Sequence, residues 1–78
     1  MSFHASITAL PAEPLGRWLM AQRGRDDAIG RLADAARRDP GFPQDGDYAA
    51  ISGRLNALQA DAEMHEALEQ AELDWAAI

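Results

Sequence analysis

The fold of this chain is decided by the stretch DDAIGRLA at residues 26–33, together with the turn residues that follow it. Its apolar residues recur at the i, i+3, i+4 spacing of a helix with one buried face. Asp26 is suited to cap this helix, because its side chain can accept a bond from a free backbone N–H group. Pro40 ends the helix, since the residue before a proline is pushed out of the helical region. The stretch therefore predicts a helix over residues 27–38.

The same kinds of signal predict three further helices. Gly24 is a natural left-handed stop after the first helix, and Asp47 can cap the third. Gly53 in the middle of the third helix either permits close helix approach or weakens the element. The predicted ranges are 14–23, 48–58 and 61–77.

These helices are expected to share one hydrophobic core. Phe42, which lies in a loop rich in Pro, Gly and Asp, is expected to plug that core. The core should also contain Trp18, Leu32, Ile51, Leu55 and Trp75. The fold class is therefore all-α, a compact bundle of four helices.

The chain divides into an N-terminal arm, residues 1–13, and a single domain, residues 14–78. Phe3, Ile7 and Leu10 have helix-like spacing, so the arm would add a fifth helix if it is ordered. The 78 residues leave room for one domain. No cysteine, targeting segment or membrane-spanning stretch is evident, which fits a cytoplasmic protein.

Charge is unevenly distributed along the chain. Residues 1–38 hold six Arg and four acidic residues, for a net charge of +2. Residues 39–78 hold one Arg and nine acidic residues, for a net charge of −8, so the total is −6. An acidic half repels a phosphate backbone, and direct nucleic-acid binding is therefore not expected.

The order of these signals resembles the YozE-type SAM-like family of small bacterial proteins. The resemblance rests on Trp18-Leu19, the stretch 26–33, the loop Asp39-x-x-Phe42-Pro43, Asp47-Tyr48 with Ile51 and Leu55, and a late Trp75. It covers roughly residues 15–77 and implies a helical fold similar to a sterile alpha motif. It supplies no activity, because the family has no established catalytic role, and sterile alpha motifs elsewhere bind proteins, themselves or RNA.

The sequence nominates no catalytic residue, metal ligand or cofactor site. A zinc site needs three or four convergent ligands, and His4 and His65 lack that spacing. The loop at residues 39–46 does not supply the alternating oxygens of a calcium loop. No Gly-rich phosphate loop or nucleophile elbow is present. We therefore expect a protein that is not an enzyme, with no metal and no cofactor.

The last helix carries the one surface feature that is costly to the fold. Four Glu residues repeat at intervals of three, with no Lys or Arg among them, and like charges at this spacing cost about 0.2–0.5 kcal/mol each. Leu73 falls inside the acidic arc, away from the apolar face. The face is either solubilising or a partner-binding surface formed by Glu63, Glu66, Glu69, Glu72, Leu73 and Asp74.

Three functions are compatible with these observations. The first is a protein-interaction module, monomeric or weakly self-associating, that binds a basic partner protein through the last helix. The second is a small acidic inhibitor from a mobile element that blocks a nucleic-acid-binding protein by charge mimicry. The third is nucleic-acid binding through the first two helices, which carry Arg17, Arg23, Arg25, Arg31, Arg37 and Arg38.

Overall fold

The computed structural model describes residues 11–78 and contains four α-helices and no strand within that range. Most of the predicted arm, including its apolar residues and His4, lies outside the described residues. The predicted all-α bundle is confirmed. The helices are α2 (Leu15–Met20), α3 (Ala28–Arg37), α4 (Tyr48–Ala57) and α5 (Ala62–Ala76).

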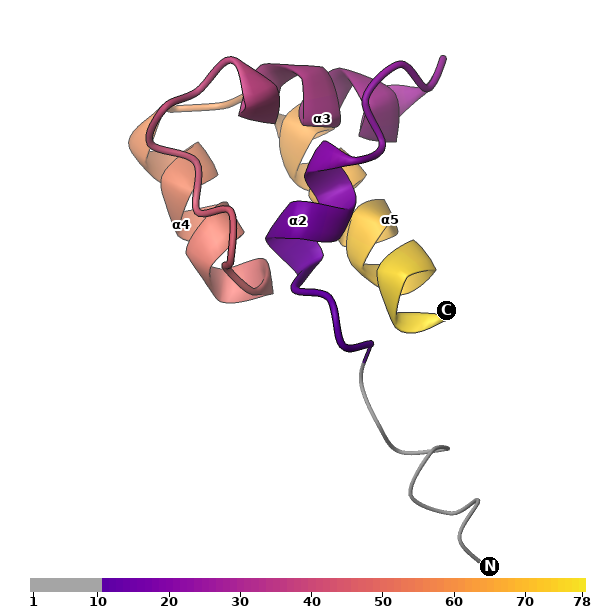
Figure 1. Ribbon diagram of the computed structural model, residues 1–78. Helices are drawn as coiled ribbons and strands as arrows, with labels where there is room; N and C mark the ends of the chain where they lie inside the picture. Colours follow the sequence, from indigo (N-terminus) through magenta and orange to yellow (C-terminus); the bar gives the residue numbers. More distant parts are fainter. Residues whose placement is uncertain (1–10) are drawn as a thin grey trace, which may run out of the picture.

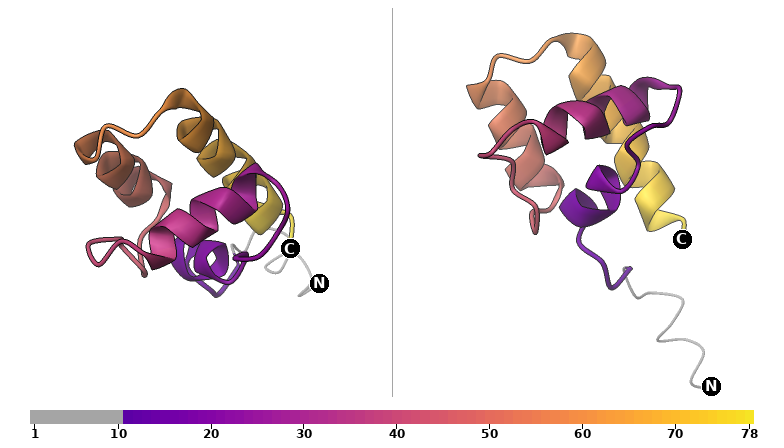
Figure 2. Two further views of the ribbon diagram at one scale, coloured as in Figure 1. Left: turned by 90° about the horizontal axis from the view of Figure 1, so that it is seen from above. Right: turned by 45° about the horizontal axis from the view of Figure 1, so that its top comes forward.

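The helices are arranged around the short α2. Helix α3 crosses the top of the molecule in Figure 1, α4 and α5 descend on either side, and α2 lies between them. Figure 2 shows that α4 and α5 are joined by a loop at one end of the bundle. Helix α5 packs on α3, α4 and α2, whereas α3 and α4 do not pack on each other. No helix within residues 11–78 is both long and apolar enough to cross a membrane.

Aspartates start three of the four helices. The side chains of Asp27, Asp47 and Asp61 each accept a bond from the backbone N–H three residues later, over 2.9–3.1 Å. Each bond satisfies a backbone donor that the helix itself leaves free. The cap of α3 is therefore Asp27, and the prediction of Asp26 was wrong by one residue. The cap Asp47 is confirmed.

The first helix is shorter than predicted. Helix α2 ends at Met20 rather than at residue 23, because the chain tightens into turns in which the Gln22 N–H donates to the Leu19 carbonyl. Gly24 then adopts a φ of 85°, the left-handed conformation expected of it.

The centre of the core is built mainly from leucines. Leu32, Ile51 and Leu55 are buried as predicted, but Trp18 and Trp75 are only half-buried and pack against the edge of the core. Both tryptophans therefore pack on the predicted core but lie at its edge, and shorter side chains occupy the fully buried positions. The fully buried large side chains are Leu15, Leu19, Leu32, Ile51 and Leu68.

The loop between α3 and α4 is fixed at two points. Phe42 is buried at 7% exposure, which confirms its predicted role as a plug. Asp39 accepts two bonds from the Arg54 guanidinium, 2.9 Å from Nε and 2.6 Å from Nη2. This two-point pairing lowers the pKa of Asp39, and the Gly41 N–H adds to the effect. The pair ties α4 to the end of α3, which it does not contact directly.

Candidate protein interface

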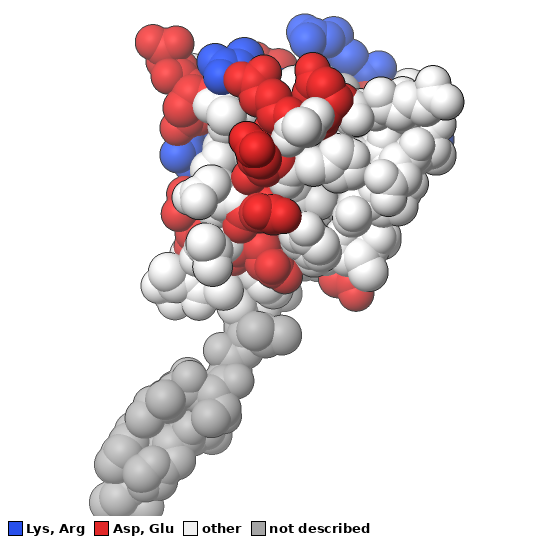
Figure 3. Space-filling model, turned by 180° about the vertical axis from the view of Figure 1, so that it is seen from behind, with Lys and Arg blue, Asp and Glu red and all other residues white. Residues whose placement is uncertain are grey.

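Helix α5 presents two unlike sides to the solvent. Ala67, Leu68 and Ala71 are buried against the rest of the bundle, and the acidic residues occupy the remainder of the helix surface. Figure 3 shows acidic side chains running down the back of the molecule, with a broad face free of Asp and Glu beside them. The helix therefore has a buried apolar face and an exposed acidic one, and some of its acids form ion pairs with arginines of neighbouring segments.

The side of α5 that faces α3 is compensated. Glu63 accepts a bond from Arg31 of α3 at 3.0 Å, and Asp74 lies 3.9 Å from the guanidinium of Arg25. The local sequence had indicated an acidic helix without basic neighbours, and at these two positions that interpretation was wrong. The basic partners are 32 and 49 residues away in sequence, so only the folded chain brings them together.

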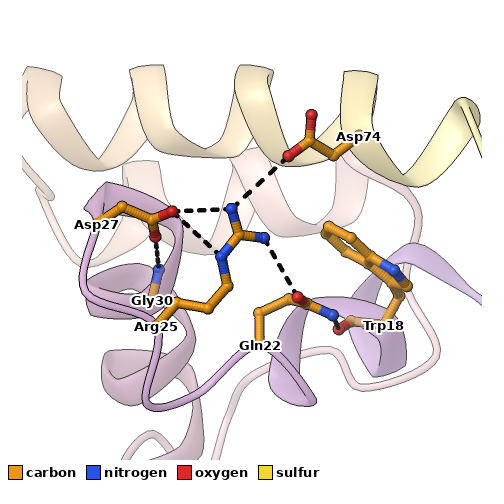
Figure 4. Close-up of polar contacts among 6 residues, drawn as sticks. All are labelled: Trp18, Gln22, Arg25, Asp27, Gly30 and Asp74. Carbon is orange, nitrogen blue, oxygen red and sulfur yellow. Dashed lines mark hydrogen bonds and ion pairs between the residues drawn. The ribbon is translucent and has the colours of Figure 1, made fainter.

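Arg25 is the centre of a polar network between α2, α3 and α5 (Figure 4). It donates to Asp27 from Nη2 at 2.8 Å and to Gln22 from Nη1 at 3.2 Å, and Gln22 in turn donates to the Trp18 carbonyl. The pKa of Asp27 is lowered, chiefly by the bond from the Gly30 N–H and also by Arg25. Polar contacts of Arg25 therefore link this side of α5 to the segment after α2 and to the start of α3.

Glycine is required at position 30 to build that network. A Cβ placed on Gly30 would lie 1.9 Å from the Arg25 carbonyl oxygen, far inside contact distance. The backbone before α3 therefore approaches the helix closely enough for Arg25 to reach Asp27 and Asp74. Sequence reasoning did not identify this requirement, because a glycine inside a helical pattern more often signals only a weak position.

Toward the C-terminal end of α5, the side that faces α4 borders an open groove. Tyr48, Leu73 and Trp75 line a groove of about 480 Å³ whose other residues include Asp47 and Glu72. The Leu73 side chain is 62% exposed, as expected from its place in the acidic arc. Sequence reasoning had placed Trp75 in the core and had not paired α5 with the first turn of α4. The groove was therefore not predicted.

Trp75 also anchors the beginning of the domain. Its indole Nε1–H donates to the Glu13 carbonyl at 2.7 Å, which ties the segment before α2 to the end of α5. The hydrogen bond satisfies the polar edge of the ring while one face of the side chain lines the groove. Trp75 therefore holds a fixed position at the groove wall.

The remaining predicted site residues lie on the outward surface of α5. Glu66 and Glu69 are exposed and Glu72 is half-buried, and no ion pair within residues 11–78 involves them. The structure thus divides the six predicted residues. Glu63 and Asp74 belong to the side paired with arginine, and Glu72 and Leu73 line the open groove. Glu66 and Glu69 are exposed on the outer surface of the helix and do not line the groove.

A second cleft, of about 220 Å³, lies between α3 and the end of α4. Phe42, Leu58 and Met64 contribute to its apolar lining. Its one charged neighbour is Asp39, whose carboxylate is held by Arg54. This cleft offers no free polar group that would orient a ligand.

Five of the Arg residues nominated on the first two helices fall into two groups. Arg25 and Arg31 pair with acidic residues, and Arg17, which pairs with Asp45, lines a hollow between α2 and the end of α3 together with Arg23 and Arg37. Within the described residues, no group of three or more His, Cys, Asp or Glu side chains could hold a metal ion.

A profile for the YozE SAM-like fold matches residues 17–76, which is more than half of the chain. The chain belongs to this family. Members of this fold family are small helical proteins that are not typically enzymes. No curated protein and no solved structure matches the chain significantly.

Proposed function

We propose that this SAM-like domain is a non-enzymatic protein-interaction module whose partner binds the open side of α5. The observation that supports the proposal is Leu73, a large apolar side chain that is 62% exposed at the edge of the α4–α5 groove. Single exposed leucines are ordinary, but this one adjoins Tyr48 and Trp75 and is accompanied by uncompensated acids. An apolar centre with a charged rim is the usual anatomy of a protein interface.

The chemistry of the partner follows from the charges on the outer surface of α5. Within residues 11–78, Glu66, Glu69 and Glu72 take part in no ion pair, so a basic surface opposite them would relieve their mutual repulsion. Glu63 and Asp74, which the sequence also nominated, already have arginine partners and contribute less. We therefore expect a partner with an apolar anchor for the groove and Lys or Arg around it.

The first test uses the full chain as bait in an extract of the source cells, at low and high salt. The captured partner is then purified and titrated against the Glu66→Gln/Glu69→Gln/Glu72→Gln variant and against Leu73→Ser. Both variants should weaken the complex, and the triple variant should also flatten its salt dependence. The matched control is Glu63→Gln/Asp74→Asn, which removes two negative charges from the arginine-paired side of the same helix. Equal weakening by this control would contradict the assignment of the groove side.

A competition experiment separates this function from charge mimicry. If the partner binds nucleic acid, a mimic and the nucleic acid would exclude each other from one site. Simultaneous binding of both would exclude mimicry and leave the interaction module. The motivation for mimicry remains the −8 charge of residues 39–78.

A further inference from the structure

A surface hollow between α2 and α3 is lined by three arginines from separate parts of the chain. Arg17 comes from α2, Arg23 from the turn after it, and Arg37 from the last turn of α3. Gln44 from the following loop also lines the hollow, which has a volume of about 440 Å³. Placing three like charges around one depression is unfavourable unless an anion lies between them.

Compensation within the molecule is incomplete. Arg17 forms an ion pair with Asp45, whose side chain is 69% exposed, and this pairing raises the pKa of Arg17. Within residues 11–78, neither Arg23 nor Arg37 takes part in an ion pair. Glu13 lines the hollow, so two carboxylates face three guanidinium groups. An external anion would therefore compete with the exposed Asp45 carboxylate for Arg17.

Arginines that line one hollow are suited to phosphate. Each guanidinium group presents paired N–H donors in a planar fork that matches two phosphate oxygens. The hollow also has Met20 and Ala21 in its wall, so it offers apolar contact for a group attached to the phosphate. The rest of the molecule is acidic, which disfavours a long polyanion but has less effect on a small one at this position.

We propose that this arginine hollow (Arg17, Arg23 and Arg37) binds a small molecule carrying a diphosphate group. The site is separate from the proposed partner surface, because no residue of α4 or α5 lines it. Failure of either proposal therefore leaves the other standing.

The test is an NMR titration of the isotope-labelled full chain with inorganic pyrophosphate at low salt, following backbone amide and arginine Nε–H signals. Saturable shifts should be confined to the hollow. The Arg23→Gln/Arg37→Gln variant should weaken binding by about tenfold or more, because each Arg supplies charge-assisted hydrogen bonds. The matched control is Arg38→Gln, which removes the charge adjacent to Arg37 on a residue that does not line the hollow, and it should change affinity by less than about twofold.

A gain of affinity provides the sharper test. Asp45→Asn removes the carboxylate that competes for Arg17 and should strengthen pyrophosphate binding several-fold. Absence of saturable shifts, or equal weakening by Arg38→Gln, would overturn the proposal in favour of diffuse counter-ion attraction. A single-stranded oligonucleotide that binds the same arginines more tightly than pyrophosphate would overturn it in favour of nucleic acid.

Discussion

The two sides of α5 differ in how they are held. On the α3 side, Glu63 and Asp74 face Arg31 and Arg25, and Arg25 also binds Asp27 at the start of α3. On the α4 side the helix borders an open groove, with Leu73 exposed. A helix that looks uniformly acidic in sequence therefore has one side engaged in the fold and one side available. The predictions below test this difference, from the largest expected effect to the smallest.

The largest effect should separate two leucines of the same helix. Leu68 is fully buried and Leu73 is 62% exposed. Leu68→Ala should lower the free energy of unfolding by about 2–5 kcal/mol, because it removes buried methyl groups and leaves a cavity. Leu73→Ala should change it by less than about 0.5 kcal/mol. Urea unfolding followed by circular dichroism measures both values.

A domain this small has limited stability, so Leu68→Ala can fail to fold. Leu68→Met keeps most of the volume and should cost less than about 1.5 kcal/mol, which remains measurable. A loss for Leu73→Ala as large as that for Leu68→Met would mean that the groove side is packed rather than open.

Acid should loosen the attachment of α4. The pKa of Asp39 lies below its ordinary value of 3.8, first because of the Arg54 side chain. A lowered carboxyl pKa gives stability that is present above the ordinary value and lost as the pH falls through the lowered one. The stability difference between the parent and Asp39→Asn should therefore be constant above about pH 5 and shrink below about pH 4.

Urea titrations at a series of pH values measure that difference. The matched control is Asp45→Asn, because Asp45 also pairs with an arginine but its side chain is exposed and does not attach α4. A difference for Asp39→Asn that persists unchanged at low pH would show that the carboxylate charge does not hold α4.

Two positions, one within α4 and one just after it, carry a residue type that their backbone conformation disfavours. Gly53 lies in the helix interior, and a Cβ there would meet nothing within 4 Å. Gln59 follows the helix with a φ of 57°, in the region that favours glycine. Gly53→Ala and Gln59→Gly should each raise the free energy of unfolding by about 0.5–1 kcal/mol. Thermal unfolding would show both gains, and a loss for Gly53→Ala would restore the alternative of close helix approach.

The smallest effect should distinguish the acids themselves. Glu63→Gln removes an exposed ion pair with Arg31 and should cost a few tenths of a kcal/mol. Glu66→Gln removes only repulsion and should be neutral or slightly stabilising. Both differences should vanish in about 1 M salt, which screens exposed charges. Equal losses for the two variants at low salt would mean that the two sides are not electrostatically different.

The positions of the helices could be predicted from local sequence chemistry, whereas the contacts between helices could not. Gly24, Asp47 and the proline after α3 mark helix ends through backbone geometry and hydrogen bonding that involve only neighbouring residues. The error at Asp26 arose because Asp26 and Asp27 are adjacent and either aspartate is suited to cap the N-terminus of α3. Asp27 caps α3 with its side chain, and Arg31 donates to Glu63 of α5.

The candidate site could be predicted only in part for the same reason. Periodicity placed Leu73 away from the core, and the structure agrees. It could not show that Arg25 and Arg31 meet α5, or that Tyr48 and Trp75 form the groove walls, because these pairs depend on how the helices cross. The match to the SAM-like family indicates the fold and carries no information about these surface pairs.

The hydrogen bond from Trp75 to the Glu13 carbonyl has a practical consequence for engineering. It brings the entry and the exit of the folded domain within one contact distance, 2.7 Å between the bonded atoms. Domains whose ends lie together tolerate circular permutation and insertion into loops of a host protein. Residues 13–76, which hold all four described helices, could thus be grafted as a closed cassette, and a permutant with new ends beside the exposed Gln59 would leave the α4–α5 groove uncovered.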